Sequence, residues 1–276
     1  MWTHPQWPGR WTPEATTAGG ELEAYAHLVG AVEGNTTFYA LPQPSVAARW
    51  AQSVPPDFRF MFKFHRSVTH ERKLCDVDAQ VGEFFTALEP CLDKMSPVAI
   101  QLPASFGPDS IDVLRSFITG LPADIRYAVE VRHLDFFDGG PFERALNDML
   151  FTVGADRIIL DSRAVFAGPR NTPAEHDAFE NKPRVPARAV ATNDQPIVRF
   201  IGQTAPEANP EYWKPWVETA ARWLCDGRSP TVFIHTPDNA DAPDLARRFY
   251  DDVRSVVPDL PAQPPAPAVR EPGLFD

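Results

Sequence analysis

The sequence predicts an α/β fold of the TIM (β/α)8 barrel type, with a first strand that is short or missing. Segments with the two-residue period of a β-strand alternate along the chain with segments of helical period. Repeated βα units favour a parallel sheet, and units of this kind over roughly 250 residues fit the barrel. A doubly wound open sheet is the alternative, but no glycine-rich phosphate fingerprint follows any predicted strand.

Seven strands are predicted, because apolar residues alternate with small or polar residues in each of them. In chain order these strands cover residues 31–38, 59–65, 97–103, 127–133, 156–162, 196–202 and 231–237. The period turns one apolar face of each strand toward the helices of the barrel. The residues assigned to these outer faces are Phe60, Phe62, Phe64, Val98, Ile100, Leu102, Tyr127, Val129, Val131, Ile158, Leu160, Val198, Phe200, Val232 and Ile234.

Helices are predicted where apolar residues recur at spacings of three and four. They cover residues 21–30, 45–54, 78–92, 109–121, 141–150, 211–227 and 242–257. Pro141 suits the first turn of its helix, and Gly227 is typical of a helix end. The helix over 21–30 precedes the first clear strand, so the opening strand of the barrel is expected to be short or absent.

The pattern predicts one barrel domain over residues 1–257. A long charged connection with several prolines, residues 163–195, separates two predicted strands, and loops of that length are usually functional or mobile. Residues 258–276 are rich in proline and lack a core-forming pattern, so we expect a disordered tail.

Composition predicts a cytoplasmic protein. The net charge of −11 does not favour indiscriminate binding to polyanions. The three cysteines have no metal-binding or disulfide spacing, and the N-terminus has no leader of the secretory type. No apolar stretch approaches the roughly 20 residues of a membrane span, so no membrane partner is expected.

The inner strand faces turn polar near their C-terminal ends, where TIM barrels carry their active sites. Buried charges without partners cost several kcal/mol each, roughly, so charges from six strands at one end of a barrel favour a polar mouth. The predicted catalytic residues are Glu33, Lys63, Glu130, Asp161 and His235. The predicted ligand-binding residues are Asn35, His65, His70, Gln101, Arg132, His133 and Arg199.

Loop cations add to this mouth, and their local sign favours a small anionic ligand such as a phosphate or a carboxylate. These cations are Arg66, Arg72, Lys73, Arg163, Lys182, Arg184 and Arg188. The leading hypothesis is therefore an enzyme that uses acid–base chemistry, as a hydrolase, lyase or isomerase, on a small anion.

Specific roles follow from residue chemistry. Glu130 is the first choice as base, and Glu33 or Asp161 is the second carboxylate, because environment can push two carboxyl pKa values apart. Lys63 stabilises an oxyanion, forms a Schiff base or serves as the ion-pair partner of a carboxylate. Arginines at positions 132 and 199 clamp the anion, and the histidines carry protons.

Other interpretations remain open. The inward charges could be internal salt bridges that only tie strands together, or could hold an effector without chemistry. A divalent metal on Glu33, Glu130, Asp161 and His235 uses suitable ligand types, but no ligand-spacing motif supports it, so no metal ligand is assigned. The cofactor is unknown.

A nucleic-acid-associated or repair-linked role is a further alternative, because loop cations can hold phosphates. The acidic net charge and the absence of a nucleic-acid-binding motif weigh against it. The C-terminal EPGLFD, with Leu274 and Phe275, resembles the short Leu-Phe peptides by which bacterial DNA-maintenance proteins dock on the sliding clamp. Glu271 stands where those peptides have glutamine.

Several motifs in order resemble those of the domain-of-unknown-function family 72 (DUF 72), also called YecE-like. The matching segments are VEGNTTFYALP (32–42), RWAQSVPPDFRFMFKFH (49–65), QLPASF (101–106) and YAVEVRHLDFF (127–137). The resemblance covers roughly residues 2–250 and implies a TIM-barrel fold, but no activity. Members usually begin with a glycine-bearing strand before the segment matched by WTHPQWPGRW (2–11), so that strand is expected to be short or missing here.

Overall fold

The computed structural model describes residues 2–13 and 20–265, which form an α/β fold with seven parallel strands. Strand β1 (Ala31–Gly34) pairs with β2 (Arg59–Phe62). The other five strands form one sheet in chain order: β3 (Val98–Gln101), β4 (Tyr127–Glu130), β5 (Asp156–Asp161), β6 (Ile197–Ile201) and β7 (Thr231–His235). All neighbouring strands run parallel, so the predicted parallel α/β architecture is confirmed.

The two sheets follow one another around a common curl. Isolated bridges from Phe60 to Met95 and from Lys63 to Ala99 connect β2 to the segment that carries β3. A contact of 2.8 Å between His235 Nε2 and the Glu33 carboxylate connects the ends of β7 and β1. Before α1 the described residues contain an isolated bridge between Pro8 and Thr12, and no strand. They therefore form a curled parallel sheet rather than a complete eight-stranded barrel.

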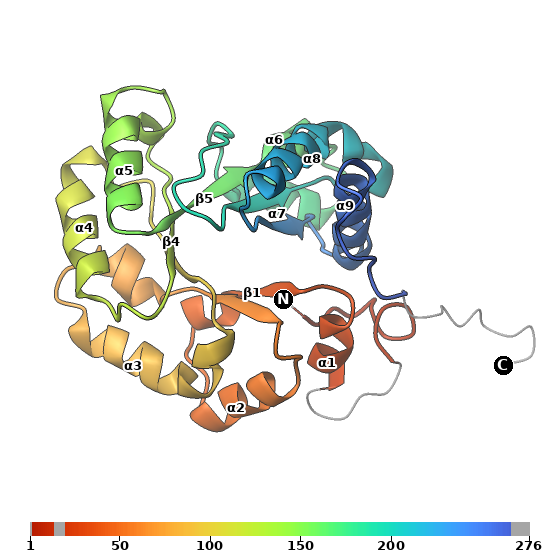
Figure 1. The fold of residues 1–276 in the computed structure, drawn as a ribbon, viewed down its shortest axis with the longest axis horizontal. Coiled ribbons are helices and arrows are strands. Elements are labelled where there is room, and N and C mark those ends of the chain that lie inside the picture. The colour runs from red at the N-terminus through yellow and green to blue at the C-terminus, as the bar shows by residue number, and fades with distance from the viewer. Residues whose placement is uncertain (1, 14–19, 266–276) are drawn as a thin grey trace, which may run out of the picture.

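Helices lie around the outside of the strands (Figure 1). The α-helices are α1 (Gly20–Ala26), α2 (Pro44–Gln52), α3 (Asp78–Leu88), α4 (Ile111–Gly120), α5 (Pro141–Thr152), α6 (Arg163–Ala167), α7 (Pro173–Asn181), α8 (Pro210–Cys225) and α9 (Ala242–Val256). Short 3-10 helices are η1 (Asn35–Phe38), η3 (Glu89–Lys94), η4 (Pro108–Ser110), η5 (Leu134–Phe136) and η6 (Pro206–Ala208), and η2 (Ser67–Glu71) is a π-helix.

The seven predicted helices are all present, and two of their ends have the predicted chemistry. Pro141 opens α5, where its missing N–H would have no helical partner. Gly227 follows α8 with a φ of 77°, a left-handed conformation that glycine adopts without a steric penalty. The helix boundaries follow from these local residues, while the faces that the helices bury follow from packing on the sheet.

The inner face of the curled sheet has a small apolar layer of its own. Six strands each contribute one buried residue to this layer: Met61, Ala99, Ala128, Ile158, Ile197 and Phe233. Ala31 of β1 is partly buried and packs against them. Their neighbours along each strand point outward into two larger cores against the helices. This alternation confirms the predicted faces of six strands.

The predicted phase of β5 is wrong. Ile158 lies in the inner layer, whereas Ile159 packs outward with Trp213 and Trp216 of α8. The strand reads DRIILD, so apolar residues occupy both of its faces. The sequence pattern therefore does not show which face points inward. As a consequence Asp161, which shares the face of Ile159, points away from the inner face.

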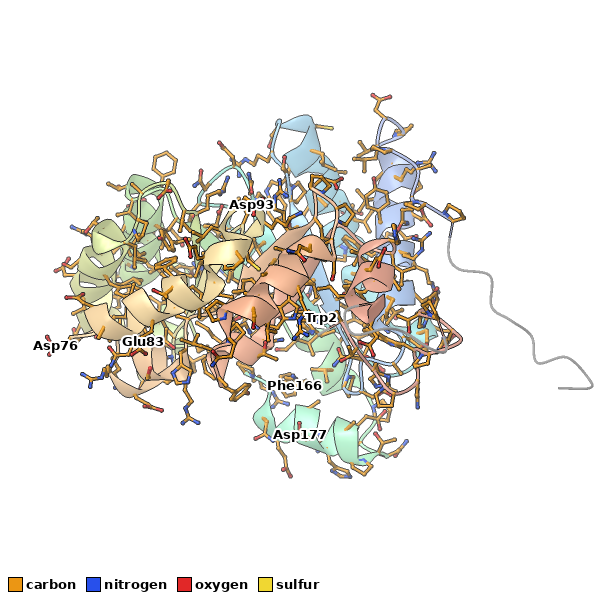
Figure 2. The ribbon with its side chains drawn as sticks, turned by 90° about the horizontal axis from the view of Figure 1, so that it is seen from below. Trp2, Asp76, Glu83, Asp93, Phe166 and Asp177 are labelled. Carbon is orange, nitrogen blue, oxygen red and sulfur yellow. The ribbon has the colours of Figure 1, made fainter. Side chains whose placement is uncertain are left out.

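The long connection 163–195 contains α6 and α7, which we did not predict. Thr172 caps α7 by accepting a hydrogen bond from the Glu175 backbone N–H, and the Glu175 side chain completes a capping box. Figure 2 shows Phe166 and Asp177 at the lower edge of the molecule, on a segment that projects from the body.

Residues 258–265 belong to the segment predicted to be disordered, and they lie along α9. Tyr250 donates its hydroxyl to the Pro261 carbonyl at 2.9 Å, and the Gln263 amide donates to the Arg247 carbonyl at 2.8 Å. The proposed clamp-binding residues Leu274 and Phe275 lie outside the described residues.

Candidate functional site

A layer of polar side chains lies one step beyond the inner apolar layer, toward the C-terminal ends of the strands. Since side chains on one face recur every second residue, each strand sends its next inward residue to this level. We call six of these the ionic layer: Glu33, Lys63, Gln101, Glu130, Arg199 and His235. On β5 the residue at this level is Leu160, because of the phase described above.

Glu33 is the centre of the ionic layer. Its carboxylate contacts Arg199 Nε at 2.6 Å, His235 Nε2 at 2.8 Å and Lys63 Nζ at 3.2 Å. Asn35 adds a longer hydrogen bond at 3.4 Å. Only 2 % of Glu33 is exposed, so these groups replace the water that an ionised carboxylate needs.

Arg199 joins Glu33 to the second buried carboxylate, Glu130. Its Nη1 donates to Glu130 Oε2, and its Nη2 donates to Glu33 Oε2 at 3.2 Å. Arg132 donates to the other Glu130 oxygen through Nε at 2.9 Å and Nη2 at 2.8 Å. Lys63 donates to Gln101 Oε1 at 2.9 Å. The layer is thus one connected network that spans β1 to β7.

The network fixes the charge states of its carboxylates. Burial raises the pKa of Glu33, but the charges of Arg199 and Lys63 outweigh burial and hold this pKa well below its usual range. Burial also raises the pKa of Glu130, but Arg199 and Arg132 oppose it and the pKa falls to about 2. Both groups are anions at neutral pH and accept protons poorly there. The expected separation of two carboxyl pKa values into one acid and one base is therefore not seen.

The groups of the site whose pKa values are shifted toward or below neutral pH are Lys63, His235 and His70. Burial, with help from the Arg199 charge, lowers the pKa of Lys63 to about 8. Burial also lowers the pKa of His235 against the effect of Glu33. Burial and the charges of Arg132 and Arg66 lower the pKa of His70. At pH 7 we expect both histidines to be mainly neutral.

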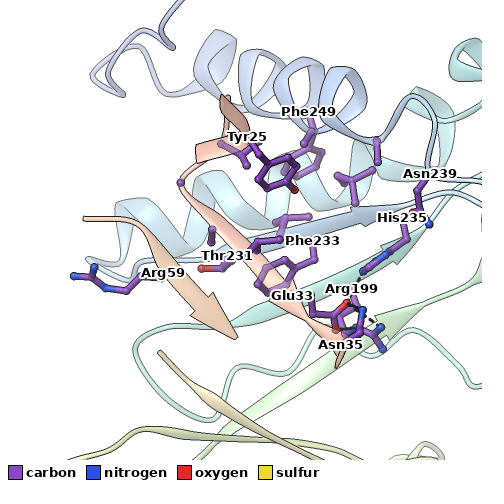
Figure 3. A pocket seen from close by; sticks show the side chains of 18 of the residues that line it. Tyr25, Glu33, Asn35, Arg59, Arg199, Thr231, Phe233, His235, Asn239 and Phe249 are labelled. Atoms are coloured by element: carbon purple, nitrogen blue, oxygen red, sulfur yellow. Dashed lines mark hydrogen bonds and ion pairs between the residues drawn. The ribbon is translucent and has the colours of Figure 1, made fainter. Parts of the chain in front are cut away.

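The ionic layer opens into a cavity of about 1440 Å³. Around its polar end the wall includes Lys63, Gln101, Arg199, His235, Arg132, Arg66, His70 and Lys182. Figure 3 shows Glu33, Asn35, Arg199 and His235 gathered at one end and Tyr25 with Phe249 farther along. The cavity therefore joins a charged end to an apolar part that lies between β1 and β7.

Cations dominate the charged end. Arg66, Arg132 and Lys182 line the cavity together with the cations of the ionic layer, while Asp177 and Glu33 are the acidic wall residues in this part. Burial and Arg199 lower the pKa of Lys182, which shows that it lies in the same field. From the sequence, Arg66 and Lys182 are recognisable only as loop cations, because a loop position has no periodic pattern that would direct its side chain inward.

Asp161 does not join the site. Its carboxylate accepts hydrogen bonds from Arg163 Nε at 3.0 Å, from Arg163 Nη2 at 2.8 Å and from Trp216 Nε1 at 2.7 Å. It is fully buried on the outer face of β5. The predicted inward orientation of Asp161 is thus wrong, and the residue fixes α6 and α8 to the strand.

Two predicted histidines also lie apart from the ionic layer. His133 accepts a hydrogen bond from the Asp135 N–H and lines a separate hollow with Gly107. His65 contacts the Ser67 hydroxyl and the Tyr39 carbonyl, which fixes the loop after β2. The structure brings Glu33, Lys63, Glu130 and His235 together, and with them the predicted binding residues Asn35, His70, Gln101, Arg132 and Arg199.

A metal ion finds no ligand set in this site. Within residues 2–13 and 20–265, no three histidine, cysteine, aspartate or glutamate side chains are placed to hold one ion. Two cations, Lys63 and Arg199, and the imidazole of His235 already surround Glu33, and two arginines contact Glu130. In the same ranges, no helix is long and apolar enough to cross a membrane.

Comparison with known proteins identifies relatives over nearly the whole chain. The family model described as "Protein of unknown function DUF72" matches residues 1–270. The UPF0759 protein YecE of Escherichia coli K12 is 40% identical over 267 residues, which cover 97% of this chain and 95% of that protein. The UPF0759 protein YunF of Bacillus subtilis is 27% identical over 145 residues, about half of each chain.

Two solved structures share the fold. A DUF72 family protein from Enterococcus faecalis V583 superposes with a TM-score of 0.67 at 19% identity, covering 88% of this chain and 95% of its own. A second, from Thermotoga maritima MSB8, has a TM-score of 0.67 at 22% identity, covering 91% and 95%. Because the family model matches residues 1–270, this chain belongs to the DUF72 family, as its sequence motifs indicated.

Proposed function

We propose that this protein is an enzyme that binds a small phosphorylated or carboxylated substrate in the cavity and acts on it by proton transfer. The observation that carries the proposal is the ionic layer itself. Side chains from β1, β4, β6 and β7, with Lys63 directly after β2, converge on one buried network that opens into a cavity with cationic walls.

Anion binding follows from the distribution of charge. Glu33 and Glu130 carry two negative charges against the three positive charges of Lys63, Arg199 and Arg132. Lys182 adds a further positive side chain to the cavity wall, and Arg66, also on the wall, pairs with Glu71 at 3.0 Å. Arginine binds phosphate and carboxylate groups in a bidentate way, and partial burial strengthens such contacts. His70 adds a donor beside Arg132.

Proton transfer is assigned to Lys63 and His235. A catalytic acid or base works best when its pKa lies near the operating pH, and Lys63, with a pKa of about 8, meets this condition. Glu33 contacts both groups and stays ionised. It therefore positions the lysine and the imidazole and does not itself exchange protons.

We infer further that the curled sheet is a TIM-type barrel with an opening between β1 and β7. Within each sheet the strands pair in chain order, isolated bridges connect β2 to the segment that carries β3, and the contact between His235 and Glu33 joins the C-terminal ends of β7 and β1. In such barrels active sites lie at this end of the strands, which is where the ionic layer lies.

Calorimetric titration with inorganic phosphate tests the anion site. We expect binding to the wild-type protein at low salt, and a loss of affinity of about tenfold or more in Arg132→Gln and in Lys182→Gln, since a charge-assisted hydrogen bond contributes about 1.5–3 kcal/mol. Arg115→Gln and Lys214→Gln are the matched controls, because these side chains lie on the outer surface.

Equal binding by all four variants would place the phosphate elsewhere on the surface. Absence of any phosphate binding to the wild-type protein would refute the anion site. A second titration at raised salt separates the two contributions, because contacts within the buried cavity are screened less than surface contacts.

A further inference from the structure

We propose that Lys63 is a nucleophile that condenses with the carbonyl group of a small anionic aldehyde or ketone to form a Schiff base. This inference rests on the proposed function and names the substrate class of the same cavity. Lys63 is only 5 % exposed and lines the cavity wall beside Gln101 and Arg199. A desolvated lysine that faces a cavity is the arrangement in which this side chain acts as a nucleophile.

The partners of Lys63 fix the position of its amine but stabilise its protonated form only weakly. The Nζ atom donates to the neutral amide oxygen of Gln101 at 2.9 Å, and contacts Glu33 at 3.2 Å. Glu33 shares its charge with Arg199 and His235 at shorter distances. Burial and the repulsion of Arg199 lower the pKa of Lys63 to about 8, so near this pH a substantial share of the protein carries the free amine.

The other lysines lack this combination. The chain has five lysines in all: Lys63, Lys73, Lys94, Lys182 and Lys214. Lys94 is buried too, but its amine donates to the Val54 and Pro55 carbonyls and it does not line the cavity. Positions 73 and 214 are exposed. Lys182 lines the cavity, but it is less buried and has the anion-binding role.

The covalent step is balanced without a further reagent. The Nζ lone pair attacks the carbonyl carbon, and the proton that leaves nitrogen is matched by one that arrives on oxygen, which gives a carbinolamine. Protonation of its hydroxyl and departure of water leave the protonated imine. In sum, the lysine ammonium and the carbonyl compound give an iminium ion and one water. Arg132 and Lys182 hold the anionic group of the substrate, while the adjoining carbonyl meets Lys63.

Reductive trapping tests this inference on the full wild-type chain. The protein is incubated at pH 8 with glyoxylate, glycolaldehyde phosphate or uncharged glycolaldehyde, together with cyanoborohydride, which reduces an imine to a stable secondary amine. Peptide mass mapping then quantifies the adduct on each of the five lysines and on the N-terminal amine. We expect both anionic aldehydes to label Lys63 at least tenfold more than Lys94, with less labelling by glycolaldehyde. Added inorganic phosphate should suppress the labelling.

The outcomes separate the two proposals. If the wild-type protein binds phosphate but Lys63 stays unlabelled while Lys73 and Lys214 react, the Schiff-base role is refuted and the anion site stands. If phosphate neither binds nor competes, the proposed function fails. Equal labelling of Lys63 by charged and uncharged aldehydes would refute the anionic substrate class. Lys63→Met should lose the adduct and Lys214→Met should keep it, although the wild-type map alone decides the question.

Discussion

Arg199 of β6 holds Glu33 of β1 through two nitrogens, Nε at 2.6 Å and Nη2 at 3.2 Å, although 166 residues separate them in sequence. The same guanidinium reaches Glu130 of β4. One buried arginine thus binds carboxylates from strands of both sheets. Because buried ion pairs repay their desolvation cost only when the geometry is good, this contact fixes how the two sheets meet and where Lys63 and His235 lie.

We expect Glu33→Gln to destabilise the protein strongly. The change removes the negative charge shared by Arg199, Lys63 and His235 and leaves buried cations without their partner, which costs about 3–5 kcal/mol. Urea unfolding of the variant measures the loss. The control is Glu23→Gln on the exposed face of α1, which should change stability by no more than about 0.5 kcal/mol. A loss as small as that of the control would mean that the network contributes little to folding.

Glu130 should make the protein sensitive to acid. Its pKa in the folded protein is about 2, below the ordinary value of 4.5, so the folded state favours the anion. The corresponding stability, on the order of 3 kcal/mol, is present above pH 4.5 and is lost as the pH falls toward 2. Comparing the unfolding free energy at pH 6 and pH 3, Glu130→Gln should show a smaller decrease than wild type and than Glu83→Gln, an exposed control on α3. Parallel decreases in all three proteins would contradict the assigned pKa.

Lys63 should make the stability of the protein depend on pH in the alkaline range. Its folded-state pKa of about 8 lies below the ordinary value of 10.5, so between these values the unfolded chain binds more protons than the folded one. Stability therefore rises with pH in this window, by about 2–3 kcal/mol. Lys63→Met should lose this rise between pH 7.5 and pH 10, and Lys214→Met should retain it. If stability rises with pH in Lys63→Met as it does in the wild-type protein, burial does not lower the pKa of the Lys63 amine.

Trp216→Phe should destabilise the fold and leave the anion site unaffected. The change removes the indole N–H that donates to buried Asp161 at 2.7 Å, and Arg163 remains as the donor to that carboxylate. A hydrogen bond to a charged group contributes about 1.5–3 kcal/mol. Trp223→Phe is the control on the same helix, because no indole hydrogen bond of Trp223 is found in the described residues. Phosphate affinity should stay within about twofold of wild type in both variants. A large loss of phosphate affinity in Trp216→Phe alone would show that Asp161 contributes to the anion site, contrary to this account.

The positions of the strands could be predicted from the sequence, but the inward-facing residues could not be identified in a strand that is apolar on both faces. Alternation identifies the inner faces of six strands, including Glu33, Lys63 and Arg199. In β5 the run Ile158, Ile159, Leu160 is apolar throughout, so only packing on Trp216 decides which residues face inward. In the long connection, Thr172 and Glu175 have the spacing of a capping box, which is the sequence signal that marks the start of α7.

The convergence of charged side chains could be predicted, but their titration could not. Period and strand direction bring Glu130 to the C-terminal end of β4, which suggested a catalytic base. Its pKa depends on Arg199 and Arg132 at hydrogen-bond distance, and such distances arise only from the packed fold. The same holds for Lys63, whose low pKa results from burial and from a guanidinium on another strand.

A crystal structure of the protein grown or soaked with phosphate, at a concentration that saturates binding in solution, tests the anion site most directly. We expect phosphate density in the cavity, with oxygens within about 3.2 Å of Arg132 and of Lys63 or Lys182. Phosphate bound only outside the cavity, or an empty cavity at saturating concentration, would contradict the site.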